Sequence, residues 1–424
     1  MDESGIRALI FIGDGLGDRP VAEFGGLTPL EYQSTPNLDQ IAKRGECGLM
    51  DPIAPGRRAG SDTAHISILG YDPFVSYTGR GPLEAMGVGM TVQRGDLAFR
   101  CNFATVKPRA DGTLIVVDRR AGRIAEGTAQ LAAAVNEAAA REKASRLKGI
   151  EFVLKESVEH RAALLMHTEG AQTPCTDVDP HDEGKAIWTS RPEEPGASAE
   201  SAEALNEWVR LTYEVLKDHP VNQARVAAKK KPANIVLPRG CGVAPHLRPF
   251  AEAHGTTGAL VVEVALIKGL GRYLEMQIID APGATGGYDT DHISLAKTAL
   301  QALEEAQIVL CNLKCPDLAG HDGLAEKKCE TVAKLDECAG VILGAVDLDK
   351  TVLVFTGDHS TPVSVRDHSG DPLPLAIAGH GVRSDEVTRY GERPCAHGNL
   401  GRVRGHDIMP LVTNLLGIQE KFGA

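Results

Sequence analysis

Short apolar runs alternate with longer helical stretches along most of this chain, and this alternation restricts the fold more than any other feature. The apolar runs, rich in β-branched residues and closed by glycine or an acid, are "ALIFIGDG", "TLIVVD", "NIVLPRG", "ALVVEVALIKG", "QIVLCNLKCPD" and "TVLVFTGDH". Helical patterns between them include "NLDQIAKRG", "HISLAKTALQALEEAQ" and "AEKKCETVAKLDECAGVILGAV". Strands that alternate with helices predict an α/β fold with a mostly parallel central sheet. In such sheets the chemistry belongs on loops just beyond the carboxyl ends of the strands.

The middle of the chain has a different pattern. A long alanine-rich helix, "AQLAAAVNEAAAREKASRLKG", precedes two predicted strands, and the Pro/Ser/Glu-rich loop "TSRPEEPGASAESAEA" leads into another long helix. The chain has 424 residues, which is more than one hydrophobic core usually supports. We therefore expect two domains, the second being an α+β domain inserted into the first.

Composition excludes several classes of protein. A formal net charge of -12 argues against a nucleic-acid partner and means that an anionic substrate would need local clusters of arginine. The apolar runs are too short for a signal peptide or a membrane span, so we expect a cytoplasmic protein with no membrane partner. The 9 cysteines contain no C-x-x-C pattern, which favours free thiols over disulfides or a zinc site.

Acids and histidines follow three of the predicted strands. Asp14 ends the first strand in "FIGDGLGD", where Asp18 fills the third glycine position of a dinucleotide fingerprint and would repel a pyrophosphate. The other two segments are "CPDLAGHDG" and "GDHSTP" with the following "RDHSGDP". Any one of these could be a turn or a surface ion pair. Three strand ends that all carry carboxylate and imidazole ligands point instead to a metal site.

Ser61, in "RRAGSDTAHISILGYDP", lies at the start of a predicted helix and could be its N-cap or a nucleophile. A serine hydroxyl needs a base or a metal for activation, and Thr63 replaces the second glycine of a nucleophile elbow. Two metal ions could activate Ser61 for attack on a phosphoryl group. Backbone N–H groups at the helix start would bind phosphate oxygens, so the cap and the nucleophile are compatible.

The chain resembles the alkaline phosphatase superfamily and, more closely, the archaeal-type 2,3-bisphosphoglycerate-independent phosphoglycerate mutases. The segments that carry this resemblance are, in order, "GDGLGDRP", "LTPLE", "TPNLD", "GSDTAH", "LGYDP", "GRGPLEAMG", "AFRCNFATV", "DRRAGRI", "RGCG", "IKGLGR", "PGATG", "DTD", "DLAGHDG" and "GDHSTP". The resemblance implies an alkaline-phosphatase-like sandwich. By this analogy a metal-binding domain comprises residues 1–76 and 249–424, and the inserted substrate-binding domain comprises residues 77–248.

The resemblance also implies two divalent metal ions, which are commonly manganese in this family, with zinc, cobalt or magnesium as alternatives. It implies that 2,3-bisphosphoglycerate is not required. One ion would be held by Asp14, Ser61, Asp358 and His359, and the other by Asp317, His321 and His368. Ser61 would be the nucleophile.

Substrate-binding residues are expected in the insert and in "IKGLGR". The motif "DRRAGR" resembles a segment whose arginines bind phosphate and carboxylate through bidentate contacts; the alternative is a solvated turn. The candidates are Asp118, Arg119, Arg123, His160, Arg161 and Lys268, with Asp177, Asp179 and His181 in second rank.

The function that follows is interconversion of 3-phosphoglycerate and 2-phosphoglycerate through a phosphoserine, a reaction of glycolysis and gluconeogenesis. Two alternatives stay open at this point. The first is a related phosphomonoesterase or a small-alcohol phosphotransferase such as a homoserine kinase-like enzyme. The second is a metal-binding module without turnover. The sequence does not specify the oligomeric state.

Overall fold

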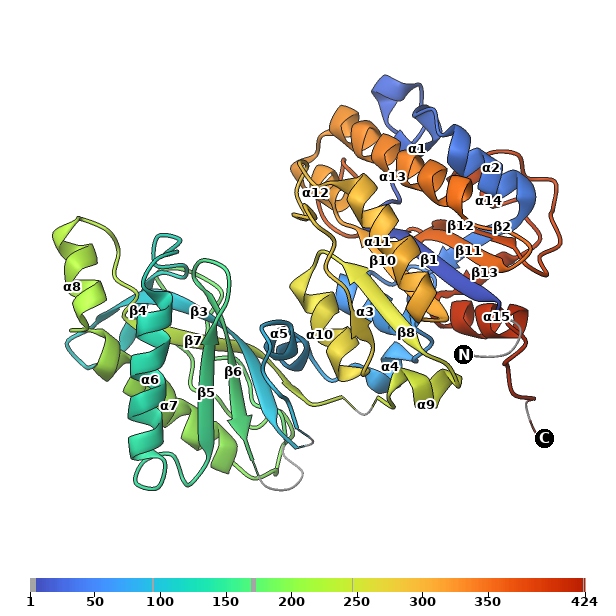
Figure 1. The fold of residues 1–424 in the computed structure, drawn as a ribbon. Helices are drawn as coiled ribbons and strands as arrows, with labels where there is room; N and C mark the ends of the chain where they lie inside the picture. The colour runs from blue at the N-terminus through green and yellow to red at the C-terminus, as the bar shows by residue number, and fades with distance from the viewer. Residues whose placement is uncertain (1–4, 94, 169–172, 246, 422, 424) are drawn as a thin grey trace. The chain divides into compact units, whose positions relative to one another are not determined.

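The chain folds into two compact units, Met1–Tyr77 with Leu247–Ala424 (unit 1) and Thr78–His246 (unit 2). The computed structural model describes residues 5–93, 95–168, 173–245, 247–421 and 423. Unit 1 is built around an eight-stranded sheet, and unit 2 around a five-stranded one (Figure 1).

The sheet of unit 1 has the strand order β13-β2-β12-β11-β1-β10-β8-β9. All neighbours are parallel except β12, which runs antiparallel to both β11 and β2. The strands are β1 (Arg7–Gly13), β2 (Gly45–Asp51), β8 (Gly258–Val262), β9 (Gln277–Ile278), β10 (Ile308–Leu313), β11 (Thr351–Gly357), β12 (Leu373–Gly379) and β13 (Gly401–Arg404). This arrangement confirms the predicted α/β fold with a mostly parallel sheet.

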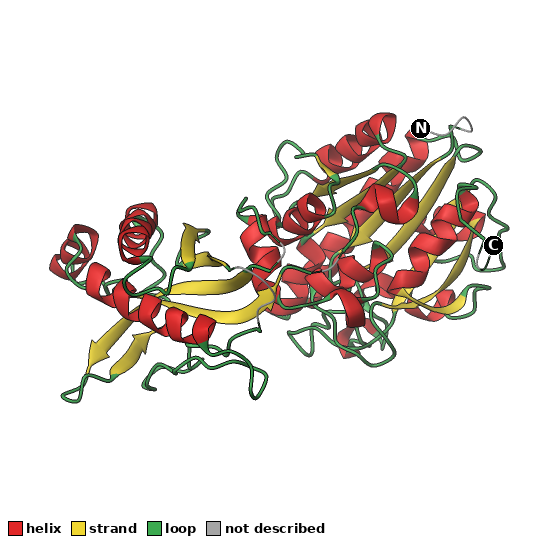
Figure 2. Ribbon diagram, turned by 90° about the horizontal axis from the view of Figure 1, so that it is seen from below, coloured by secondary structure: helices red, strands yellow, loops and turns green. Residues whose placement is uncertain are grey.

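Helices cover both faces of this sheet (Figures 1 and 2). One face carries α1 (Pro29–Tyr32), α2 (Pro36–Arg44), α11 (His292–Glu305), α12 (Cys315–Asp322), α13 (Ala325–Ala345) and α14 (Glu392–Cys395). The other carries α3 (Ser61–Ile68), α4 (Pro73–Ser76), α9 (Phe250–His254), α10 (Ala265–Tyr273) and α15 (Ile408–Leu415), with the short turns η1 (Ala22–Phe24) and η2 (Gly405–Asp407) completing the unit. Because both faces are covered, β1, β10 and β11 are buried along nearly their whole length and read as continuous apolar runs.

Unit 2 is an α+β unit with a purely antiparallel sheet among its described residues. Its strands are β3 (Leu97–Pro108), β4 (Leu114–Asp118), β5 (Glu151–Glu156), β6 (Arg161–His167) and β7 (Ile235–Val243). Its helices are α5 (Arg80–Gly87), α6 (Thr128–Glu142), α7 (Glu200–Leu216) and α8 (Pro220–Ala227). The odd-numbered residues of β3 from Leu97 to Phe103 belong to the main core, whereas Ala98 packs with α5 on the opposite face.

Two of the six apolar runs form strands outside the mostly parallel sheet, and a third forms a shorter strand than expected. "TLIVVD" and "NIVLPRG" form β4 and β7 of the antiparallel sheet, because strand length and composition do not distinguish the two kinds of sheet. The run "ALVVEVALIKG" forms a strand only up to Val262, and α10 begins at Ala265.

A buried ion pair anchors the loop that follows β1. The Nζ atom of Lys328, on α13, lies 2.8 Å from Asp18 Oδ2, and both side chains are fully buried. Lys328 Nζ also donates to the carbonyl oxygens of Gly17, at 3.1 Å, and Thr361, at 2.8 Å. This one ammonium group therefore connects the loops after β1 and β11, the two strands that carry Asp14 and Asp358.

Lys328→Met is expected to lower the free energy of unfolding by about 3–5 kcal/mol, because it leaves the carboxylate of Asp18 buried without its cation. Lys327→Met is the matched control, since the ammonium group of Lys327 pairs with the largely exposed carboxylate of Glu330 and such pairs contribute little. Urea denaturation of both variants measures the difference. A loss below about 1 kcal/mol for Lys328→Met would show that the ion pair is not structural.

Candidate active site

The register of the three central strands brings their carboxyl ends to one level. Gly13 pairs with Leu313 of β10 on one side and with Gly357 of β11 on the other. The next residues of the three strands, Asp14, Lys314 and Asp358, therefore leave the sheet side by side. Local sequence predicts each strand, but only this shared register brings their polar ends together.

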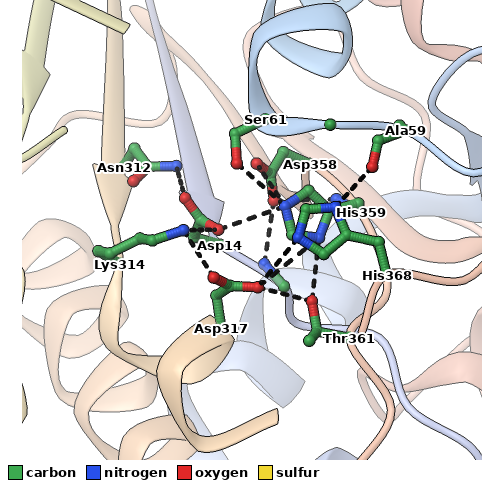
Figure 3. A network of polar contacts seen from close by, with 12 residues as sticks. Asp14, Ala59, Ser61, Asn312, Lys314, Asp317, Asp358, His359, Thr361 and His368 are labelled. Carbon is green, nitrogen blue, oxygen red and sulfur yellow. Dashed lines mark hydrogen bonds and ion pairs between the residues drawn. The ribbon is translucent and has the colours of Figure 1, made fainter. Parts of the chain in front are cut away.

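Figure 3 shows the cluster that results. Among the residues labelled there are the predicted metal ligands Asp14, Ser61, Asp317, Asp358, His359 and His368. Asn312, Lys314 and Thr361 lie with them. Asp14, Asp358 and His359 are completely buried, and Asp317 is 2 % exposed. Two groups of ligand atoms lie close enough to share an ion. These groups are Asp317 with His321 and His368, and Asp14 with Asp317 and His359.

Ser61 is the first residue of α3, and its Oγ lies 3.1 Å from His359 Nε2. The N-cap of α3 is Gly60, so the expectation that Ser61 caps the helix is wrong. Thr63 closes the helix start instead, because its Oγ1 accepts from Gly60 N and donates to Gly60 O, both at 3.0 Å. The hydroxyl of Ser61 is thus left for the cluster.

His359 has a defined tautomer. Thr361 Oγ1 has one hydrogen, which it donates to Asp317 Oδ1 at 2.7 Å, so it must accept the hydrogen of His359 Nδ1 at 3.1 Å. The lone pair of His359 Nε2 then faces Ser61 Oγ and the carboxylates of Asp14 and Asp358. Burial lowers the pKa of His359 to about 3, which keeps the imidazole neutral.

The other two histidines of the cluster, His368 and His321, are oriented in a similar way. His368 Nδ1 lies 2.7 Å from the carbonyl oxygen of Ala59, and His321 Nδ1 lies 3.1 Å from that of Arg366. A carbonyl oxygen only accepts, so each Nδ1 carries the hydrogen and each Nε2 keeps a lone pair. Both Nε2 atoms face Asp317 Oδ1, at 3.7 Å from His368 and 3.5 Å from His321. Such backbone contacts commonly orient metal-binding histidines.

The carboxylates in the cluster have perturbed acidities. Burial, reinforced by the charge of Asp358, raises the pKa of Asp14 to about 6. Burial also raises the pKa of Asp358, whose Oδ2 atom has no hydrogen-bond partner among the described residues. Burial favours the protonated form of Asp317, but the cation of Lys314 and the hydrogen bonds that the carboxylate accepts from Lys314 and Thr361 together hold its pKa well below the ordinary range. Crowded buried carboxylates of this kind require cations nearby.

The cluster fits divalent metal ions. Its donors are carboxylate oxygens, imidazole nitrogens with free lone pairs and one hydroxyl, which is the mixed oxygen and nitrogen set that such ions prefer. The unpartnered Oδ2 of Asp358 supplies an independent sign, because a buried carboxylate oxygen without a hydrogen bond is costly unless a cation satisfies it. Asp358 lies beside Asp14 and His359, where the sequence predicts it, and its role as a ligand of the same ion stays a prediction.

Several residues of the cluster are absent from the sequence-based prediction. Asn312 Nδ2 donates to Asp14 Oδ2 at 3.2 Å and contacts His65 Nε2 at 3.3 Å. His65 Nδ1 lies 2.7 Å from the carbonyl oxygen of Ser61, one turn earlier on α3. Two features of the sequence could have indicated these residues: Asn312 is a polar residue inside the apolar run "IVLCNL", and His65 follows Ser61 by four residues. The side chain of Lys314 completes this group.

The candidates for substrate binding in unit 2 lie around a cavity of about 420 Å³. Arg119, Arg123 and His181 line it with Asp118 and the acids that follow His181. Arg119 makes a bidentate pair with the fully buried Asp179, at 2.9 and 2.6 Å. Asp118 pairs with Lys231 Nζ at 2.6 Å. The cavity therefore combines open volume with one arginine, Arg119, that is held in a fixed orientation.

His160 and Arg161 lie close to the same arginine motif. Burial, followed by the charges of Arg161 and Arg120, lowers the pKa of His160. The Nδ1 atom of His160 is buried and has no hydrogen-bond partner among the described residues. Lys268 lies on α10 of unit 1, and its Nζ pairs with the exposed Asp280 at 2.5 Å. Its role as a substrate-binding residue stays a prediction.

Carboxylates, imidazoles and a serine meet at the carboxyl edge of a mostly parallel sheet, which is the arrangement of an α/β enzyme whose site could hold metal ions beside a hydroxyl. The chain belongs to the family of 2,3-bisphosphoglycerate-independent phosphoglycerate mutases, whose family profile matches residues 42–222. The family membership inferred from the sequence is thereby confirmed.

Similarity to this family extends over nearly the whole chain. A 2,3-bisphosphoglycerate-independent phosphoglycerate mutase of Methanosphaera stadtmanae is 45% identical, with 99% of this chain and 100% of that protein covered. One from Methanopyrus kandleri is 47% identical over 99% of this chain and 98% of that protein. Among solved structures, a protein from Pyrococcus horikoshii has a TM-score of 0.83 at 40% identity and 99% coverage of both chains. A cofactor-independent phosphoglycerate mutase from Thermoplasma acidophilum has a TM-score of 0.74 at 35% identity, covering 97% of this chain and 99% of that one.

Helices long and apolar enough to cross a membrane are absent from the part of the chain that the structure describes.

Proposed function

We propose that the protein interconverts 3-phosphoglycerate and 2-phosphoglycerate without 2,3-bisphosphoglycerate, by transferring the phosphoryl group to and from Ser61. The observation that carries this proposal is the placement of Ser61 Oγ, 3.1 Å from the neutral imidazole of His359 and at the edge of a cluster of buried carboxylates. The names of the relatives support the same reaction.

Each residue near Ser61 has a part in this reaction. His359 Nε2 lies 3.1 Å from Ser61 Oγ, so both atoms could bind the same ion, and Thr361 holds the imidazole in the tautomer that leaves the Nε2 lone pair free for this. The first turn of α3 presents backbone N–H groups where the oxygens of a phosphoryl group would bind. Two divalent ions, when bound by the cluster, would lower the pKa of the serine hydroxyl and offset the charge of the phosphoryl group.

The glycerate must be retained while Ser61 carries the phosphoryl group, and unit 2 supplies the arginines for this purpose. Arg100 on β3 is opposite Arg239 on β7 in the strand register. Burial, followed by the charges of Arg80 and Arg239, lowers the pKa of Arg100 to about 10, with Glu84 acting in the opposite direction. Like charges on facing residues destabilise a sheet, so their presence here indicates a site for an anion.

The acids of unit 2 do not balance these arginines. The carboxylate of Glu84 is shared between Arg80 Nε, at 3.3 Å, and Arg100 Nε, at 3.0 Å. Arg239 Nε is buried without a hydrogen-bond partner among the described residues, and the acid beside it, Asp179 at 3.9 Å, already makes a bidentate pair with Arg119. A carboxylate or phosphate would satisfy these guanidinium groups by charge-assisted hydrogen bonds. We therefore assign the glycerate carboxylate to unit 2, which supports the mutase over a simple phosphatase.

Backbone strain accompanies the predicted substrate-binding motifs. Ala121, Arg123, Glu159 and His181 adopt left-handed conformations, with φ angles of 46°, 55°, 55° and 63°. Non-glycine residues in this region cost of the order of 1–3 kcal/mol each. Similar φ angles occur outside these motifs, at Lys148, Lys229, Glu275 and Arg366. The strain therefore accompanies the predicted binding segments without being confined to them.

Manganese and a cytoplasmic location are further parts of this proposal. The oxygen-rich donor set with three imidazoles suits Mn²⁺, although zinc, cobalt and magnesium accept similar ligands. Metal-depleted protein reconstituted with each ion in turn would rank them by turnover.

The function is tested by incubating the purified protein with 3-phosphoglycerate and Mn²⁺ and measuring 2-phosphoglycerate by a coupled enolase reaction. The mutase predicts 2-phosphoglycerate with little free phosphate. Release of phosphate without 2-phosphoglycerate would identify a phosphomonoesterase, and phosphorylation of homoserine would identify the phosphotransferase alternative. Absence of all these products would contradict catalysis on these substrates.

Arg123→Ala is expected to increase the amount of free phosphate released per 2-phosphoglycerate formed. Loss of a charge-assisted hydrogen bond of about 1.5–3 kcal/mol corresponds to about 10- to 100-fold faster escape of glycerate from the phosphoserine state, after which water accepts the phosphoryl group. Arg123 is preferred to Arg119, because removing Arg119 would unpair the buried Asp179 and weaken the fold.

Both products are measured in one assay, with Arg109→Ala, on the exposed β3–β4 turn, as the control. If the ratio of free phosphate to 2-phosphoglycerate stays unchanged while total turnover falls, Arg123 acts in initial binding or folding. It then does not retain glycerate.

A further inference from the structure

Lys314 is the only lysine among the residues labelled in Figure 3, which include no arginine. It follows β10 and is the N-cap residue of α12. Its side chain is only 18% exposed, and its Nζ donates to Asp14 Oδ1 at 2.9 Å and to Asp317 Oδ2 at 2.7 Å. These two acids belong to different predicted ion sites, so Lys314 connects them.

The backbone of Lys314 is held in place by a partly buried network of its own. Glu263, just after β8, accepts from Lys314 N at 2.8 Å and from Gly286 N at 3.0 Å. It also accepts from Thr290 Oγ1. The carboxylate of Glu263 therefore fixes the point from which the lysine side chain extends toward the acids.

A lysine at this position is unfavourable for the helix. The N-terminus of a helix carries partial positive charge, and acids rather than cations are preferred there. Burial of the ammonium group adds a desolvation cost. A residue that breaks a local rule in this way is expected where function requires it.

The hydrogen-bond inventory of Lys314 leaves one donor available. An ammonium group has three hydrogens. Two are used by Asp14 and Asp317, and no third acceptor of Nζ occurs within the described ranges. Because the side chain is not completely buried, an oxygen atom of a ligand can reach the third hydrogen.

The charge of the cluster leads to the kind of ligand. Lys314 offsets one of the carboxylate charges of Asp14, Asp317 and Asp358. With two divalent ions bound and the imidazoles neutral, the cluster would carry a surplus of about two positive charges. That surplus matches the charge of about −2 on a phosphate monoester. Without Lys314 the match would be lost.

We infer that Lys314 binds an oxygen of the transferring phosphoryl group through its third hydrogen, while its other two hydrogens hold Asp14 and Asp317. The inference rests on the proposed function, because it assigns a phosphoryl group to the cluster. Lys314 and Ser61 reach that cluster from different elements, and the contacts of His359 with Asp14 and Ser61 link them (Figure 3).

The test separates phosphate binding from metal binding. Wild type, Lys314→Met and the surface control Lys327→Met are titrated with Mn²⁺ by calorimetry, and the Mn²⁺-loaded proteins are then titrated with inorganic phosphate. We expect Lys314→Met to bind Mn²⁺ at least as tightly as wild type, because a cation that competes with the ions has been removed. We expect it to bind phosphate about 10- to 100-fold more weakly, which is the effect of one charge-assisted hydrogen bond.

Lys314→Arg, which keeps the charge, should retain part of the phosphate affinity. Lys314→Gln replaces Lys314→Met if the latter does not fold. Loss of Mn²⁺ together with phosphate would show that Lys314 only positions the ligands, and unchanged phosphate affinity with full Mn²⁺ would exclude contact with the phosphoryl group. Either result overturns the inference. Failure of the proposed function would appear separately, as absence of 2-phosphoglycerate formation by the wild type.

Discussion

Ser61→Ala is expected to reduce mutase turnover by about a thousandfold or more, because alanine has no oxygen that could accept the phosphoryl group. The fold should be preserved. Alanine is the best helix former, and Ser61 is the first residue of α3 while Gly60 and Thr63 make the cap. The measurement is the initial rate of 2-phosphoglycerate formation, together with the circular dichroism spectrum and the thermal midpoint.

The matched control is Ser67→Ala on the same helix. The hydroxyl of Ser67 is buried and has no hydrogen-bond partner within the described part of the chain, so its loss should leave turnover within about twofold of wild type. Turnover of Ser61→Ala within tenfold of the wild-type rate would rule out a covalent role for this serine.

Metal removal has the second large expected effect. Chelation should abolish turnover, and added Mn²⁺ should restore it, because the buried carboxylates of Asp14, Asp317 and Asp358 depend on cations. The ligands are divided between two groups, so substitution in one group should remove one ion and leave the other.

His368→Asn is the sharper of the available substitutions. His368 belongs to the group of Asp317 and His321 alone, whereas oxygen atoms of Asp317 take part in both groups. Elemental analysis after dialysis should find about one ion per chain in His368→Asn and about two in wild type. The control is Asp322→Asn, since the carboxylate of Asp322 accepts from Tyr288 outside the cluster. Loss of both ions from His368→Asn, or of neither, would contradict the division of the ligands.

The strands and ligands of unit 1 could be predicted from the sequence because each signal is local. β1, β10 and β11 are mostly apolar runs, the first and last of which end in glycine, and polar side chains follow all three directly. In a parallel sheet the carboxyl ends of neighbouring strands meet at one edge, so ligand types at three strand ends are enough to predict a cluster.

The residues that support the ligands could not be predicted in the same way. Asn312 and His65 contact each other only because β10 lies beside β1 and α3 crosses the edge of the sheet, which no local pattern specifies. The sequence does not distinguish Lys314 from a surface residue, because a lysine three residues before an aspartate is typical of an exposed ion pair on a helix. Its burial between two acids depends on the strand register.

Substrate binding in unit 2 was predicted only in part for a related reason. "DRRAGR" and "EHR" are compact motifs that the sequence displays, and the structure brings them near one another. Arg80, Arg100 and Arg239 come from a helix and two antiparallel strands, and each taken alone resembles an ordinary surface arginine. Only the pairing of β3 with β7 shows that they share a patch of unbalanced charge.

The most direct test of phosphoryl transfer through Ser61 is to trap the phosphorylated serine. Mn²⁺-loaded protein is mixed with 3-phosphoglycerate, quenched in acid within milliseconds, digested and examined by mass spectrometry, with Ser61→Ala treated in parallel. We predict a phosphopeptide that contains residues 57–73 with the phosphate on Ser61, formed at least as fast as steady-state turnover and absent from Ser61→Ala. Full mutase turnover with no phosphate on Ser61 at any quench time, or with phosphate on another residue, would contradict the mechanism.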